Sequence, residues 1–156
     1  MSNRQFAASQ SRSLHLLDAA NLCGVAAPSL QEHRLLRKQY EHDQLITPGD
    51  LVWVADDVQG ACDMYAVWPG MKLLFGRGPD GAENVILENL DRRWVAKRFG
   101  QVVIGSGDHR FVDVACELHE AGLVVAVVIG GGRLSWQLRR QADWVHVLGI
   151  DPPRGA

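Results

Sequence analysis

Five short apolar runs constrain the fold of this chain more than any other feature of its sequence. The runs are continuous rather than alternating, and they occupy residues 14–17, 51–55, 72–75, 101–105 and 124–129. Strands that read as unbroken apolar runs are buried on both faces, as in a parallel sheet covered by helices. A further short strand is expected at 144–148. The sequence therefore predicts an α/β fold with a central, mainly parallel sheet and helices on both sides.

Helix signals lie between these runs. Ser29 is a good N-cap residue and Glu32 stands at the capping-box position, so a helix is expected from there to about His42. A helix beginning near His109 is closed by Gly122, a good residue for the position after a helix end. Further helices are predicted at residues 57–67, 82–99 and 135–142, with 82–99 as one long helix.

The chain has 156 residues, which is the size of one domain. We expect this domain at 14–148, between a tail at 1–13 and a tail at 149–156. No apolar run reaches the roughly 18 residues of a membrane helix, and the first 13 residues lack the apolar stretch of a secretory signal. Three widely spaced cysteines indicate reduced thiols, and hence a cytoplasmic location. The net charge of −2 argues against a protein that coats duplex nucleic acid.

Three acidic residues come after predicted strands. Asp18 follows the first strand, Asp80 lies in the loop after the third, and Asp108 follows the fourth. The carboxyl ends of parallel strands meet at one edge of a sheet, where ligands bind in folds of this kind. Carboxylates gathered at one place repel one another unless a cation compensates their charge. Because hard oxygen ligands suit Mg²⁺ or Mn²⁺, a divalent cation is the expected cofactor.

Each acid also has a simpler interpretation. Asp80 and Asp108 precede predicted helices, and either one taken alone is better explained as an N-cap. Glu83 falls near the middle of the apolar face of the helix expected at 82–99, so its carboxylate needs a partner, either a capping contact or a metal. Cys116 and His119 share a helix face but lack the second ligand pair of a zinc site.

Polar residues stand beside these acids. Asn21 either stabilises a turn or orients Asp18 or a substrate phosphate. Ser106 is either a turn hydroxyl or a polar group beside the cation, and with no His/Asp triad in view it is a poor candidate for a nucleophile. His109 is interpreted as a surface histidine rather than as a proton donor.

Four segments resemble the NYN domain family, the bacterial-type branch of the PIN-like ribonucleases. They are Leu14–Asn21 with its Asp-x-x-Asn ending, Gly78–Glu83, Val102–Phe111 with its Ser-Gly-Asp block, and the stretch from Gly122 to Asp143. These segments come in the family's order at its usual spacing and extend over about residues 14–148. The resemblance implies a PIN-like, Rossmann-like three-layer α/β/α sandwich and metal-dependent hydrolysis of RNA.

The resemblance also implies roles for individual residues. The acids that would hold one or two Mg²⁺ or Mn²⁺ ions and act in catalysis are Asp18, Asp80, Glu83 and Asp108. Asn21 and Ser106 would position the substrate or the attacking water. Many members carry a further Asp where this chain has Arg110, and Asp113 is expected to face solvent rather than replace it. An arginine there would either weaken metal binding or hold a substrate phosphate.

RNA is the expected partner, and no membrane partner is expected. Basic residues that could guide its backbone near the acids are Arg77, Arg110 and Arg133. Further along the chain, Arg92, Arg93, Lys97 and Arg98 form a basic helix end, which the helix dipole alone would favour. A homodimer interface would be marked by exposed tryptophans among Trp53, Trp68, Trp136 and Trp144, whereas buried ones would belong to the core.

Three other functions remain open on the sequence. The same fold with the same acids could serve as an RNA-binding or interaction module without turnover. The glycine run Gly130-Gly131-Gly132 before Arg133 could cradle a nucleotide phosphate, although it lacks the Lys-Ser/Thr of a P-loop. A phosphoacceptor domain would need adjacent acids early in the chain and a lysine after a late strand, and this chain has glycines and an arginine there.

Overall fold

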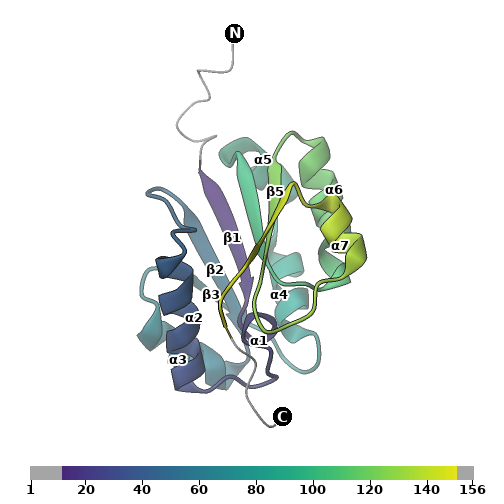
Figure 1. The fold of residues 1–156 in the computed structure, drawn as a ribbon. Coiled ribbons are helices and arrows are strands. Elements are labelled where there is room, and N and C mark those ends of the chain that lie inside the picture. The colour runs from purple at the N-terminus through teal and green to yellow at the C-terminus, as the bar shows by residue number, and fades with distance from the viewer. Residues whose placement is uncertain (1–11, 151–156) are drawn as a thin grey trace.

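The computed structural model describes residues 12–150, so residues 1–11 and 151–156 of the two expected tails lie outside the described range. Six strands form one sheet in the order β3-β2-β1-β4-β5-β6, and every neighbouring pair is parallel (Figure 1). Their bounds are β1 Ser13–Asp18, β2 Leu51–Asp56, β3 Lys72–Phe75, β4 Gln101–Gly105, β5 Val124–Ile129 and β6 Trp144–Val147. The parallel sheet predicted from the continuous apolar runs is confirmed.

Helices cover both faces of this sheet. One face packs against α1 Ala19–Cys23, α2 Leu30–His42 and α3 Val58–Val67. The other face packs against α4 Gly81–Asn89, α5 Arg92–Arg98, η2 His109–Phe111, α6 Val112–Glu120 and α7 Trp136–Gln141. The side chains of each strand alternate between the two apolar cores, because successive residues of a strand point to opposite faces. The three-layer α/β/α sandwich is therefore present.

The predictions for the start of one helix, at Ser29, and for the end of another, at Gly122, are correct in detail. Ser29 accepts a hydrogen bond from the Glu32 backbone N–H, and the Glu32 side chain accepts one from the Ser29 backbone N–H, which is a complete capping box. Gly122 lies at φ 96°, a left-handed backbone conformation that favours glycine. The predicted helix at 109–121 opens as the short 3₁₀ helix η2 before α6 begins.

The single long helix predicted at 82–99 is wrong. The chain leaves the helical conformation at Leu90, which has an extended backbone at φ −85° and ψ 110°. Asp91 then starts α5, because its carboxylate accepts hydrogen bonds from the backbone N–H groups of Arg93 and Trp94. Asp91 is therefore a helix cap, and the basic residues after it belong to a separate short helix.

The strand register aligns the carboxyl ends of the central strands. Leu17 of β1 is level with Gly105 of β4, and Asp18 is level with Ala55 of β2. In Figure 1 these ends lie at the bottom of the view beside α1, whereas α5 lies at the top. Among residues 12–150, no helix is both long and apolar enough to span a membrane. All three cysteines are free thiols, as expected.

Candidate metal centre

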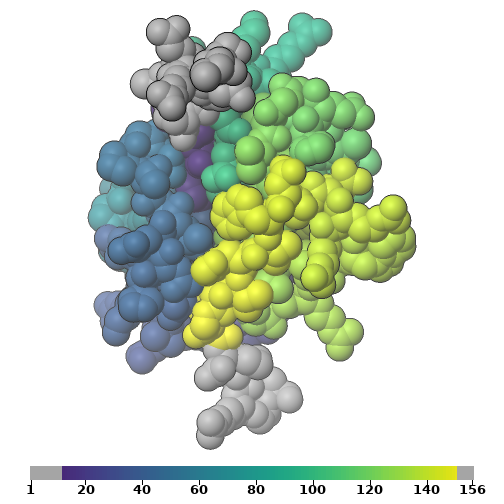
Figure 2. Space-filling model, turned by 45° about the horizontal axis from the view of Figure 1, so that its top comes forward, coloured from purple at the N-terminus to yellow at the C-terminus, as the bar shows by residue number. Residues whose placement is uncertain are grey.

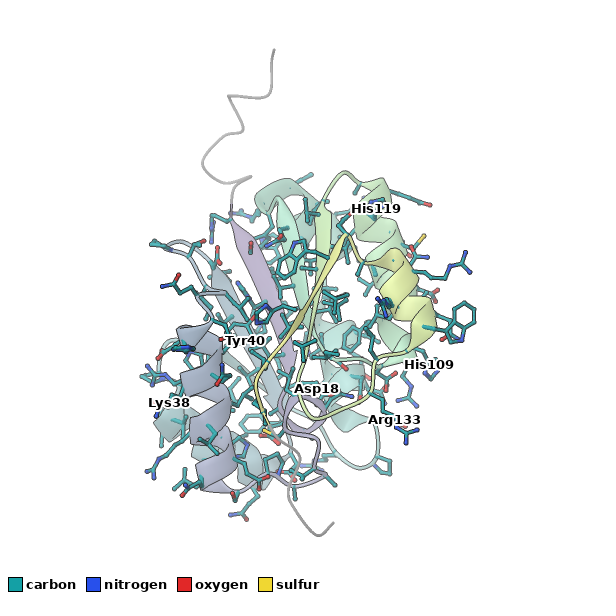
Figure 3. The ribbon with its side chains drawn as sticks, viewed as in Figure 1. Asp18, Lys38, Tyr40, His109, His119 and Arg133 are labelled. Carbon is teal, nitrogen blue, oxygen red and sulfur yellow. The ribbon has the colours of Figure 1, made fainter. Side chains whose placement is uncertain are left out.

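Four acidic side chains from three separate segments meet at the carboxyl end of the sheet. Asp18 is the last residue of β1, Asp80 and Glu83 stand at the start of α4, and Asp108 precedes η2. One carboxylate oxygen from each of Asp80, Glu83 and Asp108 lies within 4.8 Å of the other two. Figure 3 shows Asp18 below the centre of the molecule, at the end of its strand. The topology thus assembles the acids that the sequence placed at one sheet edge.

Asp18 is the most deeply buried of these acids, with 1% of its surface exposed. Its carboxylate accepts a hydrogen bond from the Asn21 backbone N–H at 3.1 Å, and it caps α1. Burial, followed by the negative charge of Glu83, raises the pKa of Asp18 to about 8, and Asp108 adds to the shift. Without a cation, Asp18 therefore holds its proton at neutral pH.

Glu83 is also buried, with 7% exposed, and it faces Asp18 from the first turn of α4. Among the described residues it accepts no backbone N–H, so it is not a capping-box acid. A buried carboxylate among other carboxylates is costly unless a proton or a cation compensates it. The capping alternative for Glu83 is therefore wrong.

Asp80 occupies an unusual backbone position. It lies at φ 62° and ψ 12°, in the left-handed region, and its side chain makes no capping hydrogen bond to α4. Instead its carboxylate accepts a hydrogen bond from the Arg110 guanidinium at 2.6 Å. The capping interpretation of Asp80 is therefore wrong, whereas Asp108 does cap, since it accepts the Arg110 backbone N–H at 2.9 Å.

Asn21 and Ser106 hold the loops that carry the acids. The Asn21 side-chain oxygen accepts the Gly107 backbone N–H at 3.1 Å, which ties α1 to the loop after β4. Ser106 is fully buried, and its hydroxyl accepts the Asp108 backbone N–H at 3.2 Å. Ser106 therefore positions Asp108, and its burial argues against the direct substrate contact expected for it.

The three candidate arginines differ in their surroundings. Arg110 is half-buried against Asp80. The hydrogen bond to Asp80 raises the pKa of its guanidinium above the usual value, and the negative charges of Asp80, Asp108 and Glu83 add to this shift. Arg77 and Arg133 are exposed on loops whose neighbouring glycines line a cavity beside the acids. In Figure 3, Arg133 projects outward at the lower right, away from the sheet. Only Arg110 is thus joined to the acids directly.

A cavity of about 740 Å³ opens beside the acids. Its lining includes Asp18, Asn21, Asp80 and Glu83, and extends to the loop between α1 and α2 and to the end of β2. The wall is largely backbone, because Gly24, Gly76, Gly78, Gly81 and Gly132 contribute to it. The cavity therefore gives an extended ligand access to the buried carboxylates.

Asp56 lines the same cavity but was missed by sequence reasoning. It is 2% exposed, and its two carboxylate oxygens accept hydrogen bonds from the Asp57 backbone N–H at 2.8 Å and from His33 at 2.5 Å. Burial lowers the pKa of His33, but the hydrogen bond and charge of Asp56 outweigh it, so the net shift is upward. Asp56 is therefore held by the buried His33 ring as well as by a backbone N–H. Its position directly after an apolar run was the available signal.

The glycine run after β5 has a packing reason. A Cβ on Gly130 would lie 2.1 Å from the Leu22 carbonyl oxygen, and one on Gly132 would lie 2.5 Å from the Asn21 carbonyl oxygen. The Gly131 backbone N–H also donates to the Leu22 carbonyl at 2.8 Å. Close approach to α1 accounts for these glycines, so the run gives no support to a phosphate cradle.

Comparisons with known proteins bear on the fold. No family model and no curated protein matches the chain. A solved structure of a protein of unknown function from Vibrio parahaemolyticus is similar, with a TM-score of 0.61 and 15% sequence identity over 92% of this chain and 96% of that one. The similarity supports the three-layer α/β/α architecture and says nothing of activity.

Proposed function

We propose that this protein is a divalent-metal-dependent ribonuclease of the NYN type, which hydrolyses RNA phosphodiester bonds at the acidic cavity. The observation that carries the proposal is the Asp18–Glu83 contact, a pair of buried carboxylates with Asp80 and Asp108 beside them. Such a set of oxygen ligands is suited to Mg²⁺ or Mn²⁺. The choice of RNA rests on the resemblance of the strand-end motifs to that family.

The residues divide into three roles. Asp80, Glu83 and Asp108 would hold the cation, with Asp18 as a further ligand from the floor of the site. A bound Mg²⁺ or Mn²⁺ supplies a Lewis acid that neutralises charge on the phosphoryl group and acidifies water. Asn21 and Ser106 fix the loop that carries Asp108, and the exposed Arg77 and Arg133 attract the phosphate backbone toward the cavity.

Replacement of Asp108 tests the proposal. We expect Asp108→Asn to keep the fold, because the amide oxygen can still accept the Arg110 backbone N–H, and to lose metal affinity. Cleavage of labelled single-stranded RNA in Mn²⁺ should fall by more than about 100-fold, beyond the loss typical of outer-shell partners. The matched control is Asp113→Asn, an exposed acid on α6. Equal cleavage by the wild type and Asp108→Asn would refute the assignment.

The Arg110–Asp80 ion pair favours a second candidate function. The Arg110 guanidinium already supplies one positive charge to the acidic cluster. A protein that uses this charge instead of a metal would bind RNA without cleaving it. Calorimetric titration separates the two functions: absence of Mn²⁺ binding at millimolar metal, together with retained RNA binding, would support the binding module.

A further inference from the structure

We propose that a basic surface on α5, remote from the acidic cavity, binds the phosphodiester backbone of single-stranded RNA. The surface consists of four exposed cations, namely Lys72, Arg93, Lys97 and Arg98, which we call the α5 basic surface. This inference rests on the proposed function only in taking RNA as the polymer. It concerns residues that do not touch the acids.

The cations of this surface form no ion pair with a carboxylate among residues 12–150. The ion pairs that lysines and arginines form with carboxylates in this range are Arg37–Glu41, Arg92–Glu117 and Arg110–Asp80. None involves the α5 basic surface. Asp91 lines the same hollow as three of these cations, and its carboxylate keeps its negative charge while it caps the helix. Four positive charges thus gather on a chain whose net charge is −2.

Aromatic rings hold two of the cations in place. Trp53 and Trp94 stack with their centroids 6.4 Å apart and their planes 20° from parallel. Lys72 lies over the Trp53 ring at 4.3 Å, and the Arg98 guanidinium lies 5.7 Å from the Trp94 centroid. Cation–π contacts of this kind fix the direction of otherwise mobile side chains. The cations are therefore partly preorganised rather than freely solvated.

The surface is also hollowed. One hollow of about 640 Å³ is lined by Asp91, Arg93, Trp94, Lys97 and Arg98. A second, of about 350 Å³, is lined by residues of β2, by Gly70 and Met71 of the turn before β3, and by Lys72 and Trp94. Trp94 lines both hollows, so the two lie next to each other beside α5. In Figure 2 the teal segment that contains α5 projects at the upper margin of the molecule.

These features define the chemistry of the occupant. An anionic polymer fits a row of cations along a depression, and its affinity depends on salt because bound counterions are released. Trp53 stacks on the Trp94 indole, and the Arg98 guanidinium lies over the same ring. These groups compete with a base for the ring, so we infer contact with the phosphodiester backbone, which tolerates any base sequence.

The distance to the acidic cavity sets a length requirement. The α5 basic surface lies toward the amino ends of the strands, because Lys72 begins β3 and α5 leads into the start of β4. A six-residue strand is about 20 Å long. A stacked nucleotide advances by about 3.4 Å, so about six nucleotides are needed to reach both sites.

The test measures binding without cleavage. Fluorescence anisotropy with a labelled oligouridine of about 12 nucleotides, in EDTA, reports affinity for the α5 basic surface irrespective of metal chemistry. The variant is Arg93→Gln/Lys97→Gln/Arg98→Gln. The control is Arg34→Gln/Lys38→Gln/Arg139→Gln, which removes the same charges from exposed positions on α2 and α7.

We expect the triple variant to bind at least about tenfold more weakly, with the slope of log K against log salt reduced by about 2, and the control to change little. If the triple variant fails to fold, Arg93→Gln alone should give a smaller loss in the same direction.

Three outcomes would overturn the inference. The first is equal RNA affinity of the triple variant and its control, and the second is absence of RNA binding by the wild type. The third is a triple variant that keeps its RNA affinity but no longer binds vesicles of anionic lipid. Failure of the proposed function looks different: in that case the wild type does not cleave RNA in Mn²⁺, while the triple variant still loses affinity in EDTA.

Discussion

Arg110 has two opposite effects on the acidic cluster. Its backbone N–H holds Asp108 at 2.9 Å, while its guanidinium occupies the carboxylate of Asp80 at 2.6 Å. The guanidinium is thus a built-in competitor for a metal that Asp80 would bind. The same group can move to a substrate phosphate when a cation takes its place, because arginine binds carboxylates and phosphates with the same fork of donors.

We therefore expect Arg110→Ala to bind Mn²⁺ more tightly than the wild type. The backbone contact to Asp108 is kept, and a competing positive charge is removed, which should raise the affinity roughly threefold to tenfold. Isothermal titration measures this directly. Arg133→Ala, which removes an exposed arginine that makes no ion pair among the described residues, is the control. Unchanged or weaker Mn²⁺ binding by Arg110→Ala would show that the guanidinium does not compete.

Sequence reasoning could predict the positions of the acids but not their partners. Asp18 and Asp108 follow apolar runs, so the sheet edge on which they lie could be read directly from the sequence. The contact between Arg110 and Asp80 joins residues 30 apart, and that between His33 and Asp56 joins residues 23 apart. Such pairings depend on loop paths and on the position of α2, which no local pattern encodes.

At the scale of elements, Asp91 separates α4 from α5. We expect Asp91→Ala to lower the free energy of unfolding by about 1 kcal/mol, because two backbone N–H groups of α5 lose their acceptor. Urea denaturation gives this value. Glu88→Ala, at an exposed position on α4, should change stability by less than about 0.5 kcal/mol. A similar loss in both variants would contradict the capping role.

The strands were predictable to within one or two residues, whereas the break between α4 and α5 was not. Strand bounds follow from apolar runs that end at polar residues. Across the break, Ile86, Leu90 and Val95 all enter the same core, so their pattern continues as if one helix carried them. The extended backbone at Leu90 keeps its side chain buried while the chain changes direction. The capping residue Asp91 was the sequence signal that deserved more weight.

Across the whole molecule, the near-neutral net charge conceals that acidic and basic residues gather at opposite ends of the sheet. Acids gather at the carboxyl edge of the sheet, and the α5 basic surface lies toward the amino edge. The α/β/α class could be deduced from the apolar runs. The strand order, however, is set by which crossover each helix makes, and neither run length nor composition specifies that. The pattern of apolar runs therefore predicted the layers, whereas the order of the strands in the sheet could not be predicted.

The stability of the metal-free protein should depend on pH through Asp18. Its pKa is 3.8 ordinarily and about 8 in the fold, so the folded state binds a proton more tightly between these values. The free energy of unfolding should therefore fall as pH rises through this range. The pKa of His33 is lowered by burial but raised further by Asp56, so its net shift is also upward. His33 therefore lowers the free energy of unfolding further as pH rises through the pKa that it has in the folded state.

The variant Asp18→Asn isolates the contribution of Asp18 to the pH dependence of stability. The amide can accept the same Asn21 backbone N–H and carries no charge. In EDTA, we expect the variant to gain about 3 to 4 kcal/mol relative to the wild type between about pH 5 and pH 8. Urea denaturation at the two pH values measures the gain. Asp113→Asn should show no such change, and a constant difference between Asp18→Asn and the wild type would disprove the buried-charge explanation.

Asp80 adopts a left-handed backbone conformation that a residue with a side chain enters only with some strain, and it makes no compensating cap. Glycine would suit that turn better. The backbone conformation at this position thus favours glycine, whereas the acidic cluster requires a carboxylate there. A mutation of Asp80 to glycine would therefore leave the fold unchanged while it removes one of the proposed metal ligands.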